Sequence, residues 1–309
     1  MELVLAIALA LALDALLGEP RRHHPLVIFG GWVDRIEIRF NRGEERRMGG
    51  VAAWCLAVLP IVLVVYLLDQ AFATSLPLSV IWSAIVLYLA LGWTSLIQHA
   101  QAVLTPLVAG DIDAAREAVS RMVSRDTAEL DDSGIAKGAI ESVLENGADA
   151  IFAALFWFLL LGAPGVVLYR LANTLDAMWG YKNERYIDFG WFSARFDDGL
   201  NLVPAQLTAL TYCLLGQRSQ AFACWRQQGL QWKSISAGSV MAAGAGAIDV
   251  SVGGDEIYHG HPQQRPVLGP ELDDSTRPSA RGIDAACTLV NRGIALWGIV
   301  IVLIVMMMR

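Results

Sequence analysis

The stretch "AIFAALFWFLLLGAPGVVLY" (residues 150–169) contains no charged side chain and is long enough to cross a membrane as a helix. The hydrocarbon core of a bilayer is about 30 Å thick, which about 20 helical residues span. Directly before this run lies "SRDTAELDDSGIAKGAIESVLENGAD" (residues 124–149), which carries seven carboxylates but only one arginine and one lysine. Together the two stretches predict an all-α polytopic membrane protein with acidic groups at the membrane surface.

The composition of the whole chain agrees with this prediction. Of its 309 residues, 55% are hydrophobic and 17% are charged, whereas soluble domains are about 25% charged. The net charge of −7 argues against a nucleic-acid partner, because such a partner requires a basic face. The four cysteines show no metal-binding spacing, and Cys55 and Cys213 lie in apolar runs, so we expect no disulfide framework.

Apolar runs elsewhere in the chain are candidates for further membrane segments. With the run above, the candidates are 2–17, 50–68, 76–97, 149–170, 200–215 and 288–308. The first run lacks the basic residues that open a signal peptide, so we expect it to be a retained helix. Arg and Lys are frequent in 18–48 and 98–148 and absent from 69–75. The positive-inside rule therefore places the first two on the cytoplasmic side and the N-terminus outside.

Strict alternation would place 170–199 outside, although this stretch carries four basic residues. One alternative is that 149–170 breaks at Gly162-Ala163-Pro164-Gly165 and does not cross, with 200–215 also re-entrant or buried. The other is six plain spans with a charged outer loop. About four to six membrane segments are thus expected, some of them re-entrant or broken.

The domain organisation follows from the same pattern. We expect one integral membrane domain over 1–309, with 98–148 and 216–287 as cytoplasmic insertions that form the active site. Within the second insertion, 251–284 is rich in Gly, Pro and Asp and is typical of an irregular soluble loop.

Polar residues gather at three places beside the apolar runs. A helix from about 134 to 146, capped by Ser133 or Asp132, would carry Glu141 and Glu145 on one face. Such a pair is either a solvated acidic face or a site for Mg²⁺ or a Mg-nucleotide, since Mg²⁺ prefers oxygen ligands. No P-loop sequence is present, so any ATP is held in another way.

The second place is "NTLDAMWGYKNERY" (residues 173–186), where Asn173 and Asp176 share one helical turn before Lys182 and Arg185. Anchoring at the membrane interface explains the aromatic residues but not the amide and the carboxylate together. The third place is Asp197–Asp198, directly before an apolar run, where Asp198 would serve as a helix N-cap.

Histidines form two further candidates. "GEPRRHHPL" (residues 18–26) sets two histidines beside two arginines, which either bind an anion or lie on the cytoplasmic surface. His259 and His261 have the spacing of metal ligands but lack a third partner nearby in the sequence.

Several of these segments resemble the adenosylcobinamide-phosphate synthase family (CbiB/CobD) through most of the chain in order. They are "LDALLGEPRRHHPLVIFG", "SRDTAELD", "AIESVLENGADAIFAALFW", "GAPGVVLYRLANTLDAMWGYKNERY", "FGWFSARFDD" and "YHGHPQQRPVLG". The chain departs from the family's "SPNAG" at Ser234–Gly238, which reads "SISAG", and it has Glu19 where the family often has Asp. The loss of the Asn leaves Ser234 and Gly238 as the candidates in that loop.

The resemblance implies a multi-pass protein of the bacterial cytoplasmic (inner) membrane with its active site facing the cytoplasm. It implies an enzyme, an amide-forming ligase of cobalamin biosynthesis that joins adenosylcobyric acid to (R)-1-aminopropan-2-ol or its O-phosphate. The corrinoid is then a substrate, and ATP and Mg²⁺ are co-reactants. Membrane lipid and other enzymes of the pathway are the expected partners.

The family's chemistry requires metal ligands, cations for phosphate oxygens and a base for the amine. We expect Asp126, Glu141 and Glu145 to hold the metal or the amine, and these three with Asp176 and Lys182 to be catalytic. The expected substrate and ATP contacts are Arg125, Thr127, Asn146, Asn173, Thr174, Tyr181, Asn183, Arg185, Asp197, His24, Ser234, Gly238 and Arg265.

Two other classes of function stay open at this point. A membrane transporter would also use intramembrane carboxylates and broken helices. A non-catalytic corrinoid-binding or assembly protein would need no nucleotide.

Overall fold

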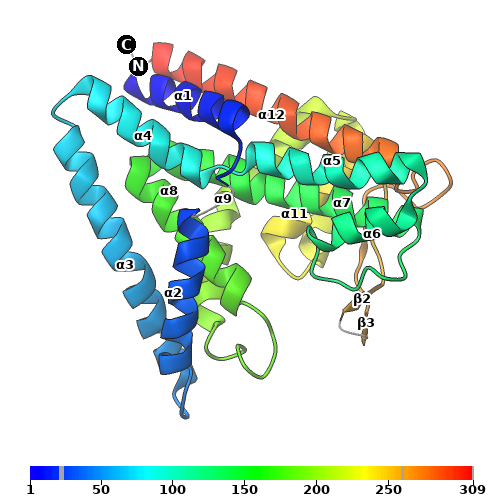
Figure 1. The fold of residues 1–309 in the computed structure, drawn as a ribbon. Helices are drawn as coiled ribbons and strands as arrows, with labels where there is room; N and C mark the ends of the chain where they lie inside the picture. The colour runs from blue at the N-terminus through cyan, green and yellow to red at the C-terminus, as the bar shows by residue number, and fades with distance from the viewer. Residues whose placement is uncertain (21–23, 259–260, 308–309) are drawn as a thin grey trace. The chain divides into compact units, whose positions relative to one another are not determined.

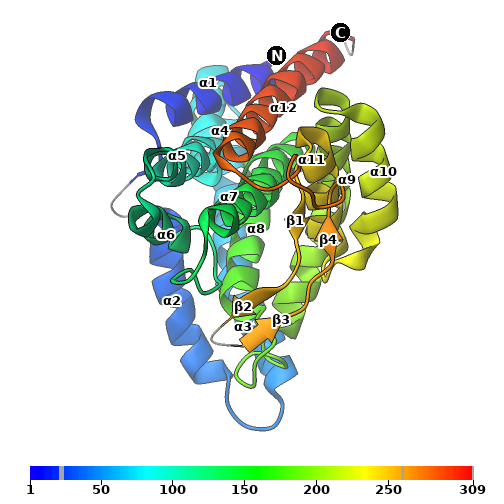
Figure 2. The same ribbon diagram turned by 90° about the vertical axis from the view of Figure 1, so that its right-hand side faces the viewer.

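The computed structural model describes residues 1–20, 24–258 and 261–307. Helices make up most of these residues, and their only strands form two small two-stranded sheets (Figures 1 and 2). The predicted all-α fold class is therefore confirmed. The chain folds into two compact units, residues 1–92 with 153–201 and residues 93–152 with 202–309.

The first unit is built on a helical core. Its elements are α1 (Glu2–Leu17), α2 (Pro25–Phe40), α3 (Arg46–Phe72), α4 (Leu76–Ala90), α8 (Ala153–Trp179) and the first part of α9 (Trp191–Leu215). Val33, Trp54, Leu175 and Trp179 pack in one buried cluster with Phe189 from the loop between α8 and α9. A Cβ on Gly50 would lie 1.9 Å from the Phe189 carbonyl oxygen, so only glycine lets α3 approach this loop.

The second unit surrounds a buried helix. Its helical elements are α5 (Trp93–Ala109), α6 (Ile112–Ser120), α7 (Asp132–Gly147), the π-helical turn η1 (Ala148–Phe152), the rest of α9, α10 (Arg218–Gln228), the 3₁₀ turn η2 (Gly229–Gln231), α11 (Ile235–Ile248) and α12 (Ala280–Met307). Most of α7 is buried, and α5, α6, α11 and α12 pack around it. A side chain on Gly244 would clash with Leu144, so α11 packs closely on α7.

The stretch 251–284 is more ordered than the predicted irregular loop. β1 (Val252–Gly253) pairs antiparallel with β4 (Val267–Leu268), and β2 (Glu256–Tyr258) pairs with β3 (His261–Gln263). Gly253 and Gly254 both have positive φ, of 79° and 74°, a conformation that side chains with a Cβ rarely adopt. These glycines turn the chain from one pair of strands into the other.

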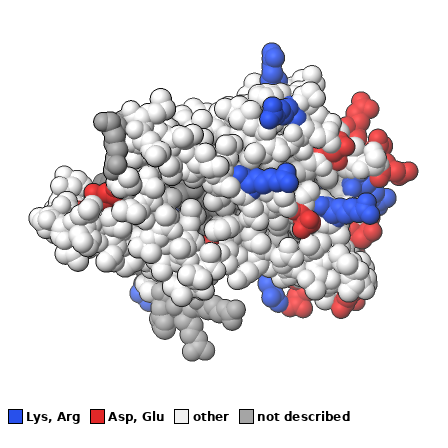
Figure 3. All heavy atoms as spheres, turned by 90° about the horizontal axis from the view of Figure 1, so that it is seen from above, with Lys and Arg blue, Asp and Glu red and all other residues white. Residues whose placement is uncertain are grey.

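Four helical stretches are long and apolar enough to cross a membrane, Arg46–Phe72, Leu76–Ala109, Asp132–Trp179 and Ala280–Met307. They contain the predicted runs 50–68, 76–97, 149–170 and most of 288–308, and they make the chain a multi-pass membrane protein. The surface seen in Figure 3 has broad areas without charged side chains, as contact with lipid requires. The runs 2–17 and 200–215 are helical, but neither belongs to the four stretches.

The predicted break in 149–170 is present. Gly162 has φ 66° and ψ −153°, outside the helical region, and Pro164 follows it. Glycine reaches this conformation without strain, and the proline ring lacks the N–H of a regular helix. The re-entrant course of this segment stays a prediction.

Two predicted helix caps were wrong. The side chain of Asp131, rather than Ser133 or Asp132, accepts a hydrogen bond from the Gly134 N–H and caps α7. Asp198 is no N-cap, because α9 already begins at Trp191. Instead, Asp198 forms an ion pair with Arg195 one turn earlier. In both cases the helix begins earlier than the sequence pattern indicates.

Candidate functional site

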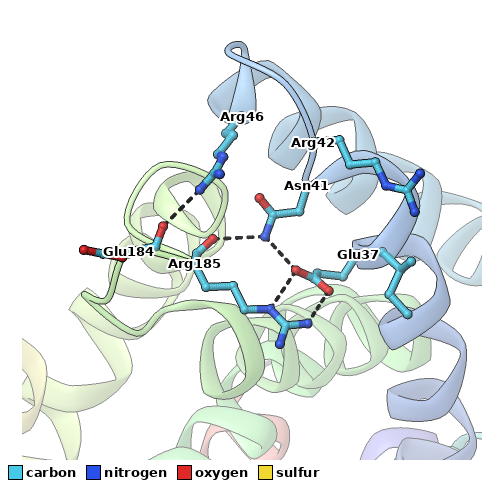
Figure 4. Close-up of a pocket in the computed structure, with 7 residues that line it drawn as sticks. Glu37, Asn41, Arg42, Arg46, Glu184 and Arg185 are labelled. Atoms are coloured by element: carbon cyan, nitrogen blue, oxygen red, sulfur yellow. Dashed lines mark hydrogen bonds and ion pairs between the residues drawn. The ribbon is translucent and has the colours of Figure 1, made fainter.

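Polar residues of the first unit form a depression of about 560 Å³ between the end of α2 and the loop after α8. We call it the Arg185 pocket (Figure 4). Its lining residues are Glu37, Ile38, Asn41, Arg42, Arg46, Glu184 and Arg185. Three of them are arginines and two are glutamates, so the lining carries one net positive charge.

Glu37 accepts the hydrogen bonds that hold two other side chains of this pocket, those of Arg185 and Asn41, in place. The Arg185 guanidinium donates to both of its oxygens, with Nε–Oε1 at 3.1 Å and Nη2–Oε2 at 2.7 Å. The Asn41 amide donates to Glu37 Oε1 and to the Arg185 carbonyl. The hydrogen bonds from Arg185 are the main reason that the pKa of Glu37 is lowered, and they outweigh the effect of burial.

The sequence predicted Arg185 as a phosphate contact but missed Glu37. Glu37 is buried, with only 5% of its side chain exposed, and lies on the face of α2 that carries Phe29, Val33 and Ile36. The sequence could have indicated Glu37, because it is a carboxylate at helical spacing on an otherwise apolar face of α2. Two nitrogen atoms of the Arg185 guanidinium, Nε and Nη2, therefore already donate hydrogen bonds to a carboxylate.

The other predicted residues of this loop have different surroundings. Tyr181, Lys182 and Asn183 are exposed. The Asn183 side chain accepts from the main-chain N–H groups of Arg185 and Tyr186, so it shapes the turn. Lys182 forms no ion pair with a carboxylate of the described residues, which leaves its ammonium available to a ligand.

A second group of polar side chains lies where α8 ends and α9 begins. Asp197 is buried and accepts hydrogen bonds from the amides of Asn201, at 2.9 Å, and Asn173, at 3.4 Å. The Tyr169 hydroxyl donates to the side-chain amide oxygen Oδ1 of Asn201 at 2.9 Å. We call these four residues, with Asp176, the Asp197 cluster.

The surroundings of Asp197 in this cluster give its carboxyl group an unusual pKa. Burial, with the nearby Asp176 carboxylate as the second cause, raises the pKa of Asp197 to about 7, against the amide hydrogen bonds that lower it. Asp176 itself lies against Gly180, where an added Cβ would meet its Oδ1 at 2.1 Å. Asp197 can therefore take up and release a proton near neutral pH.

Two other predicted residues of the first unit have local roles. The Thr174 hydroxyl donates to the Arg170 carbonyl within α8. His24 is the N-cap of α2, where its Nδ1 accepts from the Leu26 N–H at 3.2 Å. Burial lowers the pKa of His24. A neutral imidazole fits this capping role, because Nδ1 must carry a lone pair.

The predicted carboxylate Glu141 lies in a buried ion network of the second unit. Arg125 contacts Glu141 at 3.0 Å and Glu256 at 2.7 Å, Lys137 contacts Glu256 at 2.5 Å, and Arg265 contacts both carboxylates, at 3.1 and 3.5 Å. The Gly253 N–H also donates to Glu141 at 2.7 Å. We call these five residues the Glu141 network, which holds three cations against two carboxylates.

Lys137 and Glu256 were missed by the sequence analysis. Lys137 precedes Glu141 by one helical turn of α7, a spacing that indicates a shared face. Glu256 lies on β2, and nothing local in the sequence connects it to α7. Arg125 and Arg265, which were predicted to contact substrate or ATP, do lie together, but they contact the carboxylates of Glu141 and Glu256. The Arg265 guanidinium also lies 5.0 Å from the Trp232 ring centre.

The predicted metal ligands do not gather into one centre. No group of three His, Cys, Asp or Glu side chains suited to a metal occurs within the described parts of the chain. Glu141 has its oxygens held by guanidinium groups and an amide, Asp126 is exposed, and Glu145 is half-buried. Glu141 therefore does not fit a Mg²⁺ ligand in this arrangement.

The remaining candidates of the second unit are spread over separate elements. Asn146 donates to Ser142 on α7, and Thr127 is half-buried in the loop before α7. Ser234 is the N-cap residue of α11, and Gly238 lets α11 approach the Gly229 carbonyl, which an added Cβ would meet at 2.3 Å. His261 is exposed on β3. His259 lies outside the described residues.

Comparisons with known proteins cover almost the whole chain. The family model described as CobD/Cbib protein matches residues 7–290. "Cobalamin biosynthesis protein CobD" of Stutzerimonas stutzeri is 53% identical over 305 residues, 97% of this chain and 97% of the relative. The proteins of the same name from Chromobacterium violaceum and Mycobacterium tuberculosis are 53% and 36% identical, over 96% and 94% of this chain and 95% and 93% of their own lengths.

No solved structure matches the chain. The expectation drawn from its sequence motifs is confirmed at the level of the family, and a role in cobalamin biosynthesis follows from it. The full-length match to relatives of one name, together with the match over residues 7–290, shows that this chain belongs to the CobD/Cbib protein family.

Proposed function

We propose that this protein is an ATP-dependent amide ligase of cobalamin biosynthesis. It joins the carboxylate of adenosylcobyric acid to the amine of (R)-1-aminopropan-2-ol or of its O-phosphate, and the product is adenosylcobinamide or its phosphate. Family membership supports the pathway. The observation that carries the chemistry is the buried Asp197, whose pKa is raised to about 7.

The reaction needs activation of the carboxylate, because a carboxylate and an ammonium group at neutral pH form only a salt. In the proposed first step, a carboxylate oxygen of the corrinoid attacks the γ-phosphorus of ATP, and ADP leaves. The amine nitrogen then attacks the acyl carbon of the mixed anhydride, and inorganic phosphate leaves. Before that attack, the ammonium group must lose a proton to a base.

We assign this base to Asp197. A carboxylate with its ordinary pKa near 4 is a poor proton acceptor at pH 7, whereas a base with a pKa near the working pH is efficient. Asn173 and Asn201 hold the two oxygens of Asp197 in place through their amides. Asp176 adds a second carboxylate that attracts the cationic amine.

We assign a phosphate contact of ATP to Lys182, which is exposed and forms no ion pair with a described carboxylate. Mg²⁺ enters this scheme bound to the nucleotide, as part of the substrate, and no step depends on a metal held by the protein. We further assign Arg125, Glu141 and Arg265 to the support of the β-strands and the loop before α7. Catalytic roles for Asp126 and Glu145 stay predictions.

We place the enzyme in the bacterial cytoplasmic membrane with its active site facing the cytoplasm. The four apolar stretches support a multi-pass protein, and the basic residues in 18–48 support a cytoplasmic position for that segment. Other enzymes of the pathway are the proposed protein partners.

The test uses the full chain in detergent with adenosylcobyric acid, aminopropanol or its phosphate, and Mg-ATP. Corrinoid mass and ADP release are followed together. Product that requires all three substrates supports the ligase. Corrinoid binding without ADP or product supports a non-catalytic carrier, and uptake into vesicles without chemical change supports a transporter.

Asp197→Asn and its neighbour Asp198→Asn form a matched pair for this assay. Asp198 is less buried and already paired with Arg195, so its variant is expected to keep most of the activity. Asp197→Asn is expected to lose at least tenfold, because general base catalysis contributes about 10² to 10⁴ in rate. Equal activity in the two variants would remove Asp197 from the chemistry.

A further inference from the structure

We propose that the Arg185 pocket binds a phosphate group through Arg42 and Arg46, and that an anionic phospholipid at the membrane surface carries this phosphate. The inference does not depend on amide formation, because phosphate binding here requires no turnover. None of the sequence-predicted contacts includes Arg42 or Arg46.

The charges of the pocket are the first support. Arg185 is neutralised by the buried Glu37, which accepts two hydrogen bonds from its guanidinium. Among the described residues, Arg46 donates only to a neutral acceptor, the Glu184 carbonyl oxygen, at 3.0 Å. Arg42 and Arg46 form no ion pair with any carboxylate of the described residues. Two guanidinium groups at one depression therefore form no ion pair with that part of the chain, and the lining as a whole carries one net positive charge.

The arrangement of the side chains is the second support (Figure 4). Glu184 meets Arg46 through its main chain, and its carboxylate points away from the other lining residues. Arg42 and Arg46 extend from the two ends of the turn that joins α2 to α3 and point to opposite sides, Arg46 toward Glu184 and Arg42 away from it. Both side chains could turn toward a ligand anion without breaking an ion pair with a described residue. The planar fork of arginine suits phosphate oxygens.

The pocket is also held rigidly. Asn41 ties the end of α2 to Glu37 and to the Arg185 main chain. The close approach of Gly50 to Phe189 keeps the start of α3 against the same loop. Because these contacts are made within the protein, a phosphate group would order little more than the two arginine side chains.

The position of the pocket favours a lipid. Arg46 is the first residue of α3, one of the four stretches that can cross a membrane. Ile38 lines the pocket and is 57% exposed. Met48 and Ile187, each two residues after a lining arginine in the sequence, are 65% and 55% exposed. Basic and exposed apolar side chains together are typical of the zone where lipid headgroups lie.

The experiment compares two double variants of the full chain. Arg42→Gln/Arg46→Gln removes the two proposed contacts and leaves Glu37 and Arg185 intact. Arg35→Gln/Arg39→Gln removes the same charge from exposed positions of α2 that do not line the pocket. Each protein is freed of lipid in neutral detergent, and binding of phosphatidylglycerol and of phosphatidylcholine is measured by native mass spectrometry.

The proposal expects phosphatidylglycerol to bind at least tenfold more weakly to Arg42→Gln/Arg46→Gln than to the unchanged protein, with Arg35→Gln/Arg39→Gln nearly unaffected. Zwitterionic phosphatidylcholine is expected to bind weakly to all three. Equal losses in both double variants, or none in Arg42→Gln/Arg46→Gln, would overturn it. Arg42→Gln alone is the control for folding, since the exposed Arg42 forms no ion pair with a described residue, and it is expected to show part of the loss.

A second arm separates the two sources of phosphate. Inorganic phosphate and aminopropanol phosphate are titrated into the lipid-free protein and then into protein loaded with phosphatidylglycerol. Weak binding that does not displace the lipid supports the lipid as the source. Tight binding that displaces it, and that Arg42→Gln/Arg46→Gln abolishes, overturns the lipid assignment and makes the site one for a soluble phosphate ester. Amide-forming activity is measured separately, so failure of the proposed ligase would not be mistaken for failure of this site.

Discussion

Glu37 and Glu141 are both carboxylates held by arginine, yet the two regions around them differ. Glu37 pairs with one arginine whose side chain is 61% exposed, at the edge of an open pocket. Glu141 pairs with Arg125 and Arg265, whose side chains are only 2% and 8% exposed. Water can replace a partner in the first region but not in the second. The same pair of residue types therefore lies at a solvent-accessible surface in one unit and in a closed core in the other.

The largest effect is expected from Glu141→Gln. The change leaves the buried Arg125 and Arg265 and the half-buried Lys137 with one carboxylate. An uncompensated buried charge costs about 3–5 kcal/mol of unfolding free energy. Thermal unfolding of the purified protein in detergent measures this loss. Glu145→Gln, one turn later on the half-buried face, is the control and should lose far less. A stable Glu141→Gln protein without ligase activity would instead make Glu141 a catalytic residue.

Asp197 extends the comparison to a buried carboxylate held by amides. Its pKa is raised from 3.8 to about 7, so between about pH 4 and pH 7 the folded protein keeps a proton that the unfolded chain has released. The stability contributed by this proton falls as the pH rises through that window and stays level above it. Unfolding of the unchanged protein and of Asp197→Asn should therefore differ in slope between pH 4 and 7. Parallel curves would contradict the raised pKa.

The rate of amide formation should also depend on the protonation of Asp197, but it should rise with pH where the stability falls. If Asp197 is the base, the rate of amide formation rises with pH up to about 7, and Asp197→Asn loses this rise. The rate is measured with saturating Mg-ATP. Asp198→Asn serves as the control that keeps the rise, displaced slightly to lower pH, because Asp198 is the last of the causes that raise the pKa of Asp197.

Glu37→Gln is expected to have a smaller effect, of about 1 kcal/mol, because the exposed Arg185 can turn to water. The pKa of Glu37 is lowered below its usual 4.5, so its contribution is complete above that pH and is lost as the pH falls through the lowered value. Unfolding at pH 7 and at pH 3 tests both points. A loss as large as that of Glu141→Gln would remove the distinction between the two regions.

The smallest effect is expected from Arg47→Gln. The ion pair of Arg47 and Asp188 has 63% and 48% of its side chains exposed, and such surface pairs contribute about 0–1 kcal/mol. A shift in thermal unfolding clearly beyond that range would show that the loop after α8 depends on this pair, and that exposure alone does not rank these interactions.

The elements of the fold were largely predictable from the sequence, and the partners of the charged residues were not. Local patterns predicted the apolar runs 50–68 and 76–97 and the break at Gly162. The length of an apolar run and a Gly-Ala-Pro-Gly sequence determine the backbone conformation through neighbouring residues alone. The helix that contains Glu141 was also predicted, although its cap was assigned to the wrong residue. The contact of this helix with Glu256, which pairs with Lys137, was missed, because no local pattern connects β2 to α7.

By itself, the sequence determined that this chain is helical, multi-pass and a member of one family, since hydrophobic run length and extended similarity depend on no distant contact. Only the tertiary structure decided which carboxylates are available. Glu141 and Glu145 are one turn apart on α7, yet the main chain of Gly253, 112 residues after Glu141, donates to Glu141. A carboxylate takes its charge and its reactivity from the groups around it, and folding brings those groups together from remote parts of the chain.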